Sequence, residues 1–323
     1  MSTPGFIGGI DLGGTKILSL CIDEELATVG QDLRATEAGR GPNAVIETMA
    51  ASFLAAAGGR TLRAVGVSAP GPSNPAVGLV TSPPNLPGWR DVPLAALLSA
   101  RLGLPCWIEN DANAAALAEH RLGAGRGSRH MILVTLGTGI GGGLILDGRL
   151  YHGASGAAGE IGHMQLVPGG PSCGCGRSGC LEALASGIAL AREATALAVA
   201  EPVGLVASLA RQENVEPDAR ILDQAADAGD LAADAIIRQA GRYLGAGLTN
   251  LVDVFNPEVI VIGGSLRKLG QRYLGTAYEV VEREAFRQSK SDVRFVEATL
   301  GDEAPAVGAA LVALDRLTSS DQA

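Results

Sequence analysis

The chain has 323 residues, 47% of them apolar, and a formal net charge of −9. Its length suits two domains of ordinary size. The acidic balance and the absence of a basic run disfavour nucleic acid as a partner. No apolar run reaches the roughly 18 residues that a membrane-spanning helix needs, and no signal segment opens the sequence. The five cysteines form no even disulfide framework. We therefore expect a cytoplasmic protein with no membrane partner.

Residues 6–121 alternate between predicted strands and helices. Two apolar runs flank the turn Gly13-Gly14-Thr15 and predict a β-hairpin over 6–12 and 17–22. Helical spacing that starts at a proline predicts a helix over 42–57. The other predicted elements are a strand over 62–68, a helix over 94–102, a strand over 106–109 and a helix over 112–121.

The pattern restarts near residue 120. A strand over 131–136, a glycine-rich turn over 137–143 and a returning strand over 144–146 repeat the organisation of the first hairpin. Two halves with like beginnings predict a duplicated α/β fold with a cleft between the halves. The later predicted elements are a helix over 231–255, a strand over 259–262 and a helix over 305–317.

Two glycine-rich turns are candidate phosphate sites. The 45 glycines cluster after short apolar runs, which indicates backbone that approaches a ligand closely. In the first turn, Gly13 and Gly14 expose N–H groups, Thr15 offers a hydroxyl and Asp11 could hold Mg²⁺. It is not a Walker A loop, because a strand rather than a helix follows it. An ordinary β-turn is the alternative.

The second turn, 136–143, satisfies the dinucleotide pattern G-x-G-x-x-G. A Rossmann turn must open into a helix, however, and the apolar run 144–146 continues as a strand. We therefore interpret this turn as a second phosphate-binding hairpin.

Polar residues at 109–113 lie where a strand passes into a helix. Asp111 could serve as a general base for a hydroxyl that attacks phosphorus, and Asn110 could orient the substrate. The alternative is helix capping, which Asp and Asn also favour. Asn85 lies in a loop stiffened by three prolines and suits hydroxyl recognition, although such loops often only connect elements.

A cysteine-rich segment predicts zinc. His163, Cys173, Cys175 and Cys180 form H-x9-C-x-C-x4-C, a ligand set for tetrahedral Zn²⁺ that leaves no position open for catalysis. One ring nitrogen of the histidine could bind zinc while the other meets a ligand hydroxyl. A zinc ribbon on nucleic acid is the competing use, which the acidic charge disfavours. The site does not need the carboxylates of Glu160 and Glu182, which are left to bind something else.

Together these motifs resemble the ROK family of sugar kinases and sugar-responsive repressors. The resemblance covers nearly the whole chain and rests on DLGGTK (11–16), PNLPGW (84–89), ENDAN (109–113), LGTGIGGG (136–143), GEIGH (159–163), CGCGRSGCLE (173–182) and NPEVIVIGGS (256–265). It implies an actin-like, hexokinase/ribonuclease H-like fold whose two lobes close over sugar and ATP. The small lobe is expected over 1–119, with the helix at about 303–323 packing back on it, and the larger lobe over 120–302.

The resemblance also implies roles for single residues. Asp111 corresponds to the base, Asp11 to the Mg²⁺-associated acid, and Gly263 with Gly264 to the glycines that approach adenosine. The remaining implied residues are the sugar ligands Asn85, Asn110, Glu160, His163 and Glu182, and the phosphate-loop residues Gly13, Thr15, Lys16, Gly137, Thr138 and Gly139. A homodimer or homotetramer is the implied assembly.

Within the family, the motifs look most similar to bacterial glucokinases. Only ten residues precede Asp11, so we expect no DNA-binding segment of the repressor branch before it. The expected reaction is transfer of the γ-phosphoryl of ATP to the 6-hydroxyl of glucose. Kinases of N-acetylmannosamine, N-acetylglucosamine, fructose and allose share most of these motifs, and a non-catalytic sugar sensor is the rival class. Whether ADP or polyphosphate replaces ATP is left to experiment.

Overall fold

The computed structural model describes residues 5–320, which pack as two compact units. Among these residues, unit 1 comprises 5–127, 143–158 and 299–320, and unit 2 comprises 128–142 and 159–298. The lobe boundaries expected from the sequence stay a prediction. No single described helix is long and apolar enough to cross a membrane, although one sharply bent helix pair passes the same test of length and composition.

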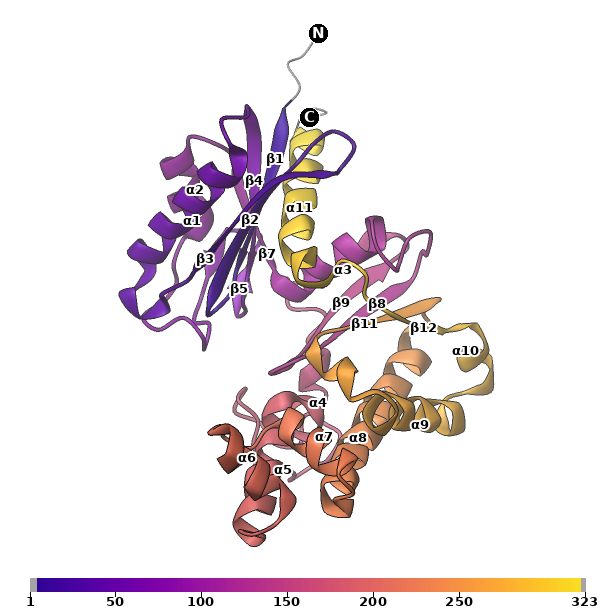
Figure 1. The fold of residues 1–323 in the computed structure, drawn as a ribbon. Coiled ribbons are helices and arrows are strands. Elements are labelled where there is room, and N and C mark those ends of the chain that lie inside the picture. Colours follow the sequence, from indigo (N-terminus) through magenta and orange to yellow (C-terminus); the bar gives the residue numbers. More distant parts are fainter. Residues whose placement is uncertain (1–4, 321–323) are drawn as a thin grey trace. The chain divides into compact units, whose positions relative to one another are not determined.

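Unit 1 is built on a mixed five-stranded sheet of order β3-β2-β1-β4-β7 (Figure 1). β1 pairs with β2 in antiparallel register, which confirms the predicted hairpin, and β1, β4 and β7 run parallel. The strands are β1 (Phe6–Leu12), β2 (Lys16–Ile22), β3 (Thr28–Ala35), β4 (Leu62–Ala69) and β7 (Cys106–Asn110). A small separate ribbon pairs β5 (Ser73–Asn74) with β6 (Leu79–Val80).

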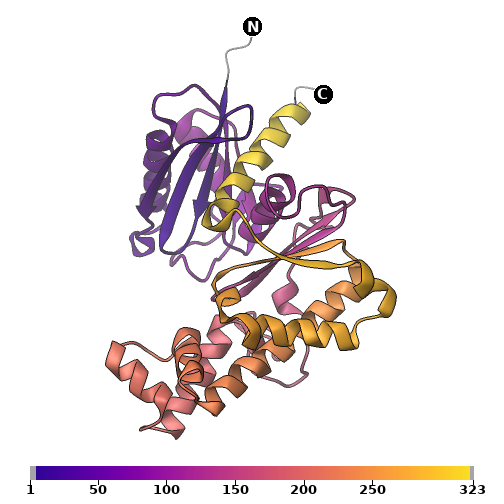
Figure 2. The ribbon, with the colours of Figure 1, turned by 45° about the vertical axis from the view of Figure 1, so that its right-hand side comes forward.

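Helices lie on both faces of this sheet. α1 (Pro42–Ala57) packs on β2 and β3 and contacts α2 (Leu94–Leu102), with Met49 and Phe53 fully buried in the core. On the other face, α11 (Ala304–Ser320) packs along β1 and β4 and against α3 (Asp111–Arg121), as both ribbon views show (Figure 1, Figure 2).

Glycine allows α11 to approach the sheet this closely. A Cβ at Gly9 would collide with the carbonyl oxygen of Ala306, and one at Gly66 with that of Ala309. A Cβ at Gly308 of α11 would likewise collide with the carbonyl oxygen of Ala114 in α3. At these positions the glycines serve packing, because one backbone lies directly on another.

A second sheet has the order β10-β9-β8-β11-β12, which repeats the first sheet strand for strand and confirms the duplication. β11 pairs in parallel with β8 and with β12. The strands are β8 (Met131–Leu136), β9 (Ile140–Leu146), β10 (Arg149–Leu150), β11 (Val259–Gly263) and β12 (Arg294–Glu297). β9 already begins at Ile140, so the glycines 141–143 that we assigned to the turn belong to the strand.

The helices of unit 2 gather around the long helix α8 (Leu231–Phe255), which contacts α4, α7 and α9. Asp230 caps the N-terminus of α8, where its carboxylate accepts hydrogen bonds from two N–H groups of the first turn. Asn256, in the left-handed region, caps the C-terminus. The others are α4 (Leu181–Ala185), α5 (Gly187–Ala200), α6 (Leu205–Glu213), α7 (Ala219–Asp227), α9 (Thr276–Glu284) and α10 (Arg287–Asp292).

Candidate functional site

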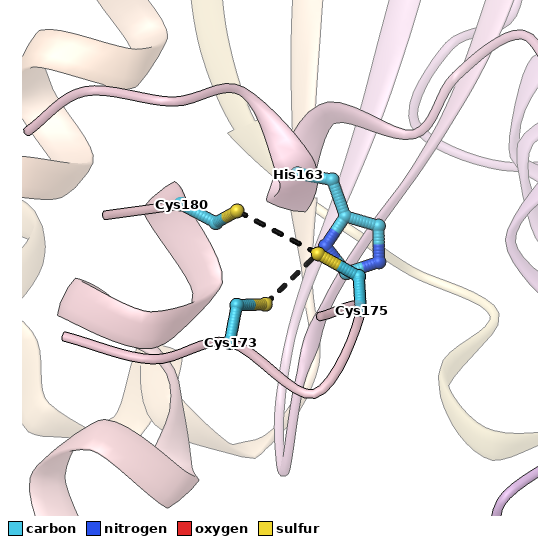
Figure 3. A group of neighbouring side chains, drawn as sticks. All are labelled: His163, Cys173, Cys175 and Cys180. Atoms are coloured by element: carbon cyan, nitrogen blue, oxygen red, sulfur yellow. Dashed lines mark hydrogen bonds between the residues drawn. The ribbon is translucent and has the colours of Figure 1, made fainter. Parts of the chain in front are cut away.

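The predicted zinc ligands come together in unit 2 (Figure 3). The four ligand atoms of His163, Cys173, Cys175 and Cys180 lie within 4.8 Å of one another. His163 Nδ1 is 3.6 Å from Cys173 Sγ, and the sulfurs of Cys175 and Cys180 are 3.8 Å apart. A tetrahedron with metal–sulfur bonds of about 2.3 Å has edges of about 3.8 Å. These side chains therefore fit a closed, structural Zn²⁺ site.

The local backbone favours the thiolate form that a metal needs. The backbone N–H of Arg177 lowers the pKa of the Cys175 thiol to about 6. Burial raises the pKa of Cys173 to about 12, so a cation would be needed to draw the remaining protons from the cluster.

The histidine ring links the cysteine cluster to a carboxylate. Because Nδ1 of His163 faces Cys173, Nε2 points away from the sulfurs and lies 3.9 Å from Glu160 Oε2. The Glu160 side chain is 61% exposed and so can reach a ligand from solvent. One ring nitrogen is thus placed for a metal and the other near a carboxylate. The contact with a ligand hydroxyl that the sequence suggested stays a prediction.

The second carboxylate connects the cysteine segment to the glycine hairpin between β8 and β9. Glu182 Oε2 accepts a hydrogen bond from the Ile140 N–H at 2.9 Å, and its Oε1 lies 3.8 Å from Cys173 Sγ. A Cβ at Gly139 would collide with this carboxylate. The sequence had assigned Glu182 to a sugar, and the structure adds this contact with the hairpin.

The turn of the second hairpin is braced at its base. Gly137 N–H donates to Gly139 O at 3.0 Å, and Gly187 N–H at the start of α5 donates to Gly137 O at 2.8 Å. Thr138 at the tip is exposed. Since β9 follows directly, the Rossmann alternative is wrong for this turn.

Gly264 follows β11 with a φ of +88°. A Cβ there would collide with Leu136 O, whereas one at Gly263 would meet only ordinary contacts. Packing against β8 therefore explains a glycine at 264, and the adenosine role of both positions stays a prediction.

In unit 1, the first hairpin turn is closed by a Gly13 N–H bond to Lys16 O at 2.9 Å. Thr36, which directly follows β3, supports it, because its hydroxyl donates to Gly13 O at 2.7 Å and its N–H to Thr15 O at 2.9 Å. Lys16 Nζ lies 2.5 Å from Asp302 Oδ2 in an exposed ion pair, which contributes little to stability.

Asp11 carries the electrostatics of a cation ligand. Burial raises its pKa from 3.8 to about 6, the Ser68 hydroxyl bond at 2.8 Å opposes that shift, and the nearby charge of Asp111 adds to it. A carboxyl group that is shielded from water and close to another negative charge is stabilised in its ionised form by a nearby cation. These residues therefore fit Mg²⁺, which Asp11 would hold directly or through water.

Asn110 and Asp111 lie at the start of α3. Asn110 Oδ1 accepts from the N–H groups of Ala112 and Asn113 at 3.0 and 3.2 Å, so Asn110 caps this helix. Its role toward a substrate stays a prediction. Asp111 is exposed at the first helical position, where its Oδ1 accepts from the Ala112 N–H at 2.8 Å. A helix N-terminus favours the ionised carboxylate that a general base must be.

Asn85 is exposed and directly precedes two buried anchors of the same loop, Leu86 and Trp89. A Cβ at Gly14 would lie 2.8 Å from the Asn85 Cβ, so this loop packs against the first hairpin turn. Sequence reasoning assigned no role to Glu109, Asn113 or His152, whose side chains form a hydrogen-bonded group. In the sequence, only the glutamate and asparagine of ENDAN could have indicated this hydrogen-bonded group.

A family model described as the ROK family matches residues 7–316. The chain belongs to the ROK family. A relative of this ROK protein is the glucokinase of Streptomyces coelicolor, 38% identical over 95% of this chain and 96% of the relative.

Solved structures of ROK proteins agree with the fold. The ROK hexokinase from Thermus thermophilus superposes with a TM-score of 0.83 at 38% identity, over 97% of this chain and 99% of that one. The ROK family glucokinase from Streptomyces griseus in complex with glucose and AMPPNP has a TM-score of 0.82 at 36% identity, over 96% and 100%. The predicted actin-like α/β fold is confirmed.

Proposed function

We propose that this ROK protein is a sugar kinase that transfers the γ-phosphoryl of ATP to the 6-hydroxyl of glucose. The observation that carries the proposal is the exposed Asp111 carboxylate at the N-terminus of α3. It comes in a chain that is similar along nearly its whole length to glucokinases. A carboxylate held there can accept a hydroxyl proton while the oxygen attacks phosphorus.

Sugar recognition falls to a small set of polar side chains. We assign Asn85, Asn110, Glu160, His163 and Glu182 as ligands of the sugar hydroxyls. Carboxylate and amide oxygens accept from hydroxyl groups, and the amide and imidazole N–H groups donate to them. The Cys₃His site, with Zn²⁺ bound, would fix where the last three of these residues point, and zinc would take no part in the chemistry.

Nucleotide binding falls to the two glycine hairpins. We assign Gly13, Thr15 and Lys16 of the first, and Gly137, Thr138 and Gly139 of the second, to the phosphates of ATP, and Gly263 with Gly264 to adenosine. Mg²⁺ at Asp11 would supply positive charge to the phosphates. The threonine hydroxyls and the lysine ammonium would orient the phosphoryl group toward the hydroxyl.

The test is an ATP-consumption assay across a panel of glucose, mannose, fructose, allose, N-acetylmannosamine and N-acetylglucosamine, repeated with ADP and with polyphosphate as donors. We expect the highest kcat/KM for glucose with ATP, and a product that glucose-6-phosphate dehydrogenase oxidises. A higher kcat/KM for an N-acetylhexosamine would support a sugar kinase but reject glucose as its preferred substrate. Glucose binding in calorimetry without any phosphoryl transfer would instead identify a sensor.

A further inference from the structure

The buried carboxylate of Glu109 lies two residues before the proposed base and is bonded by three donors. Glu109 is 3% exposed at the end of β7. Its Oε1 accepts from the Asn110 N–H at 2.9 Å and from Asn113 Nδ2 at 3.0 Å, and its Oε2 lies 2.8 Å from His152 Nε2. Burying a carboxylate is costly unless such partners satisfy it.

Two of these donors bracket Asp111 in the sequence. Asn110 precedes the base and caps α3, and Asn113 completes the first helical turn after it. By bonding both, Glu109 fixes the residue before Asp111 and the turn that follows. The backbone on both sides of Asp111 is therefore held by the Glu109 carboxylate.

The third donor comes from outside this segment. His152 follows β10, its side chain is 38% exposed, and its carbonyl oxygen accepts the Ala158 N–H at 3.2 Å. Residues 152–158, closed by that bond, lead directly into Gly159 and Glu160.

The hydrogen bond between His152 and the buried acid favours the protonated form of the ring. The hydrogen bond with Glu109 raises the pKa of His152, more than burial and the like charge of Arg316 on α11 lower it. The ring is thus stabilised as an imidazolium that compensates the Glu109 charge.

We propose that Glu109 and His152 are positioning residues for Asp111. The pair holds the start of α3 in place and keeps a second negative charge near the base neutralised. This inference rests on the proposed kinase function. If the imidazolium is removed, Glu109 stands as an uncompensated charge two residues from Asp111, and like charges disfavour ionisation of the base.

The test is a pair of substitutions at one position, His152→Gln and His152→Arg, assayed with glucose and ATP across pH. For His152→Gln we expect kcat to fall about tenfold or more, because small displacements of a catalytic group are costly. The glucose KM should change by a smaller factor, and the acid limb of the kcat/KM profile should move to higher pH. His152→Arg keeps a charged donor, so it should restore most of kcat and return the acid limb to its wild-type position.

Glu109→Gln provides a second readout if the histidine variants fold poorly. It removes the negative charge, so kcat should fall without an upward shift of the acid limb. An unchanged kcat and pH profile in His152→Gln would overturn the inference. So would a loss of kcat with an unmoved acid limb that arginine does not rescue. A wild-type protein inactive on the whole sugar panel would overturn the proposed function and this inference with it.

Discussion

Glu182 Oε2 accepts a hydrogen bond from the backbone N–H of Ile140 at 2.9 Å, which joins the cysteine segment to the glycine hairpin between β8 and β9. Glu182 stands two residues after Cys180, so disorder in the metal cluster would reach the hairpin through one side chain. Damage to the zinc site should therefore weaken nucleotide binding as well as sugar binding.

Cys175→Ser tests this connection. We expect loss of bound zinc and a rise of roughly tenfold in the glucose KM, a size common when a metal site loses its order, together with a smaller rise in the ATP KM. Metal analysis and steady-state kinetics measure both, with Cys106→Ala of β7 as the matched cysteine control. A zinc-free variant with wild-type KM values would disprove the structural role of the cluster.

Asp111→Asn tests the base. Removing a general base lowers kcat by about 10²- to 10⁴-fold, whereas the amide can still bond a sugar hydroxyl. We therefore expect glucose affinity within a few-fold of wild type by calorimetry. Asp91→Asn, a change at an exposed aspartate in the loop before α2, is the matched control. Near-normal turnover in Asp111→Asn would show that Asp111 is not the general base.

The raised pKa of Asp11 predicts a pH-dependent stability. Since its folded pKa of about 6 lies above its ordinary 3.8, the fold favours the protonated form. Stability from this group is therefore full below about pH 4, is lost as pH rises to about 6, and stays lost above. The loss is about 3 kcal/mol, because one pKa unit corresponds to about 1.4 kcal/mol.

Asp11→Asn should remove this loss. In magnesium-free buffer we expect the variant to be more stable than wild type above pH 6 and to differ less near pH 4, while kinase activity falls because the cation ligand is gone. Urea unfolding at several pH values measures the difference. A constant difference between the two proteins across this range would contradict the prediction.

Glu119 predicts a purely structural effect. Its fully buried carboxylate accepts from the N–H groups of Ala124, Thr299 and Leu300 at 2.8–2.9 Å. In Glu119→Gln one oxygen becomes a donor that faces another donor. We expect a loss of about 2 kcal/mol, typical of hydrogen bonds to a charged group. Urea unfolding would show it, with the exposed Glu24→Gln as control.

Much of the fold could be predicted from the sequence because the proline and glycine residues that end elements and the spacing of apolar residues indicate the same boundaries. α1 begins with Pro42 at its N-terminus and ends before Gly58 in the left-handed region, so both ends match the predicted helix. The sequence did not predict β3. None of its residues is buried, and its mix of glycine, charged and apolar residues shows no alternation of buried and exposed positions.

Some features of the candidate site could likewise be predicted from the sequence, and others could not. The zinc ligands lie within 18 residues, so their spacing alone identified them, and the structure brings them together. The contact between Glu109 and His152 joins residues 43 positions apart, and that between Lys16 and Asp302 joins residues 286 apart. Pairs like these depend on the tertiary fold, and no local pattern marks them.

The close packing of α11 on β1 and β4 has a consequence for synthesis. During translation, the strands of unit 1 emerge long before residues 304–320, whose helix covers one face of their sheet. Domains usually fold as units, beginning with the N-terminal one. Here the order is reversed: the first sheet must wait, with the glycines that receive α11 uncovered, until unit 2 has left the ribosome.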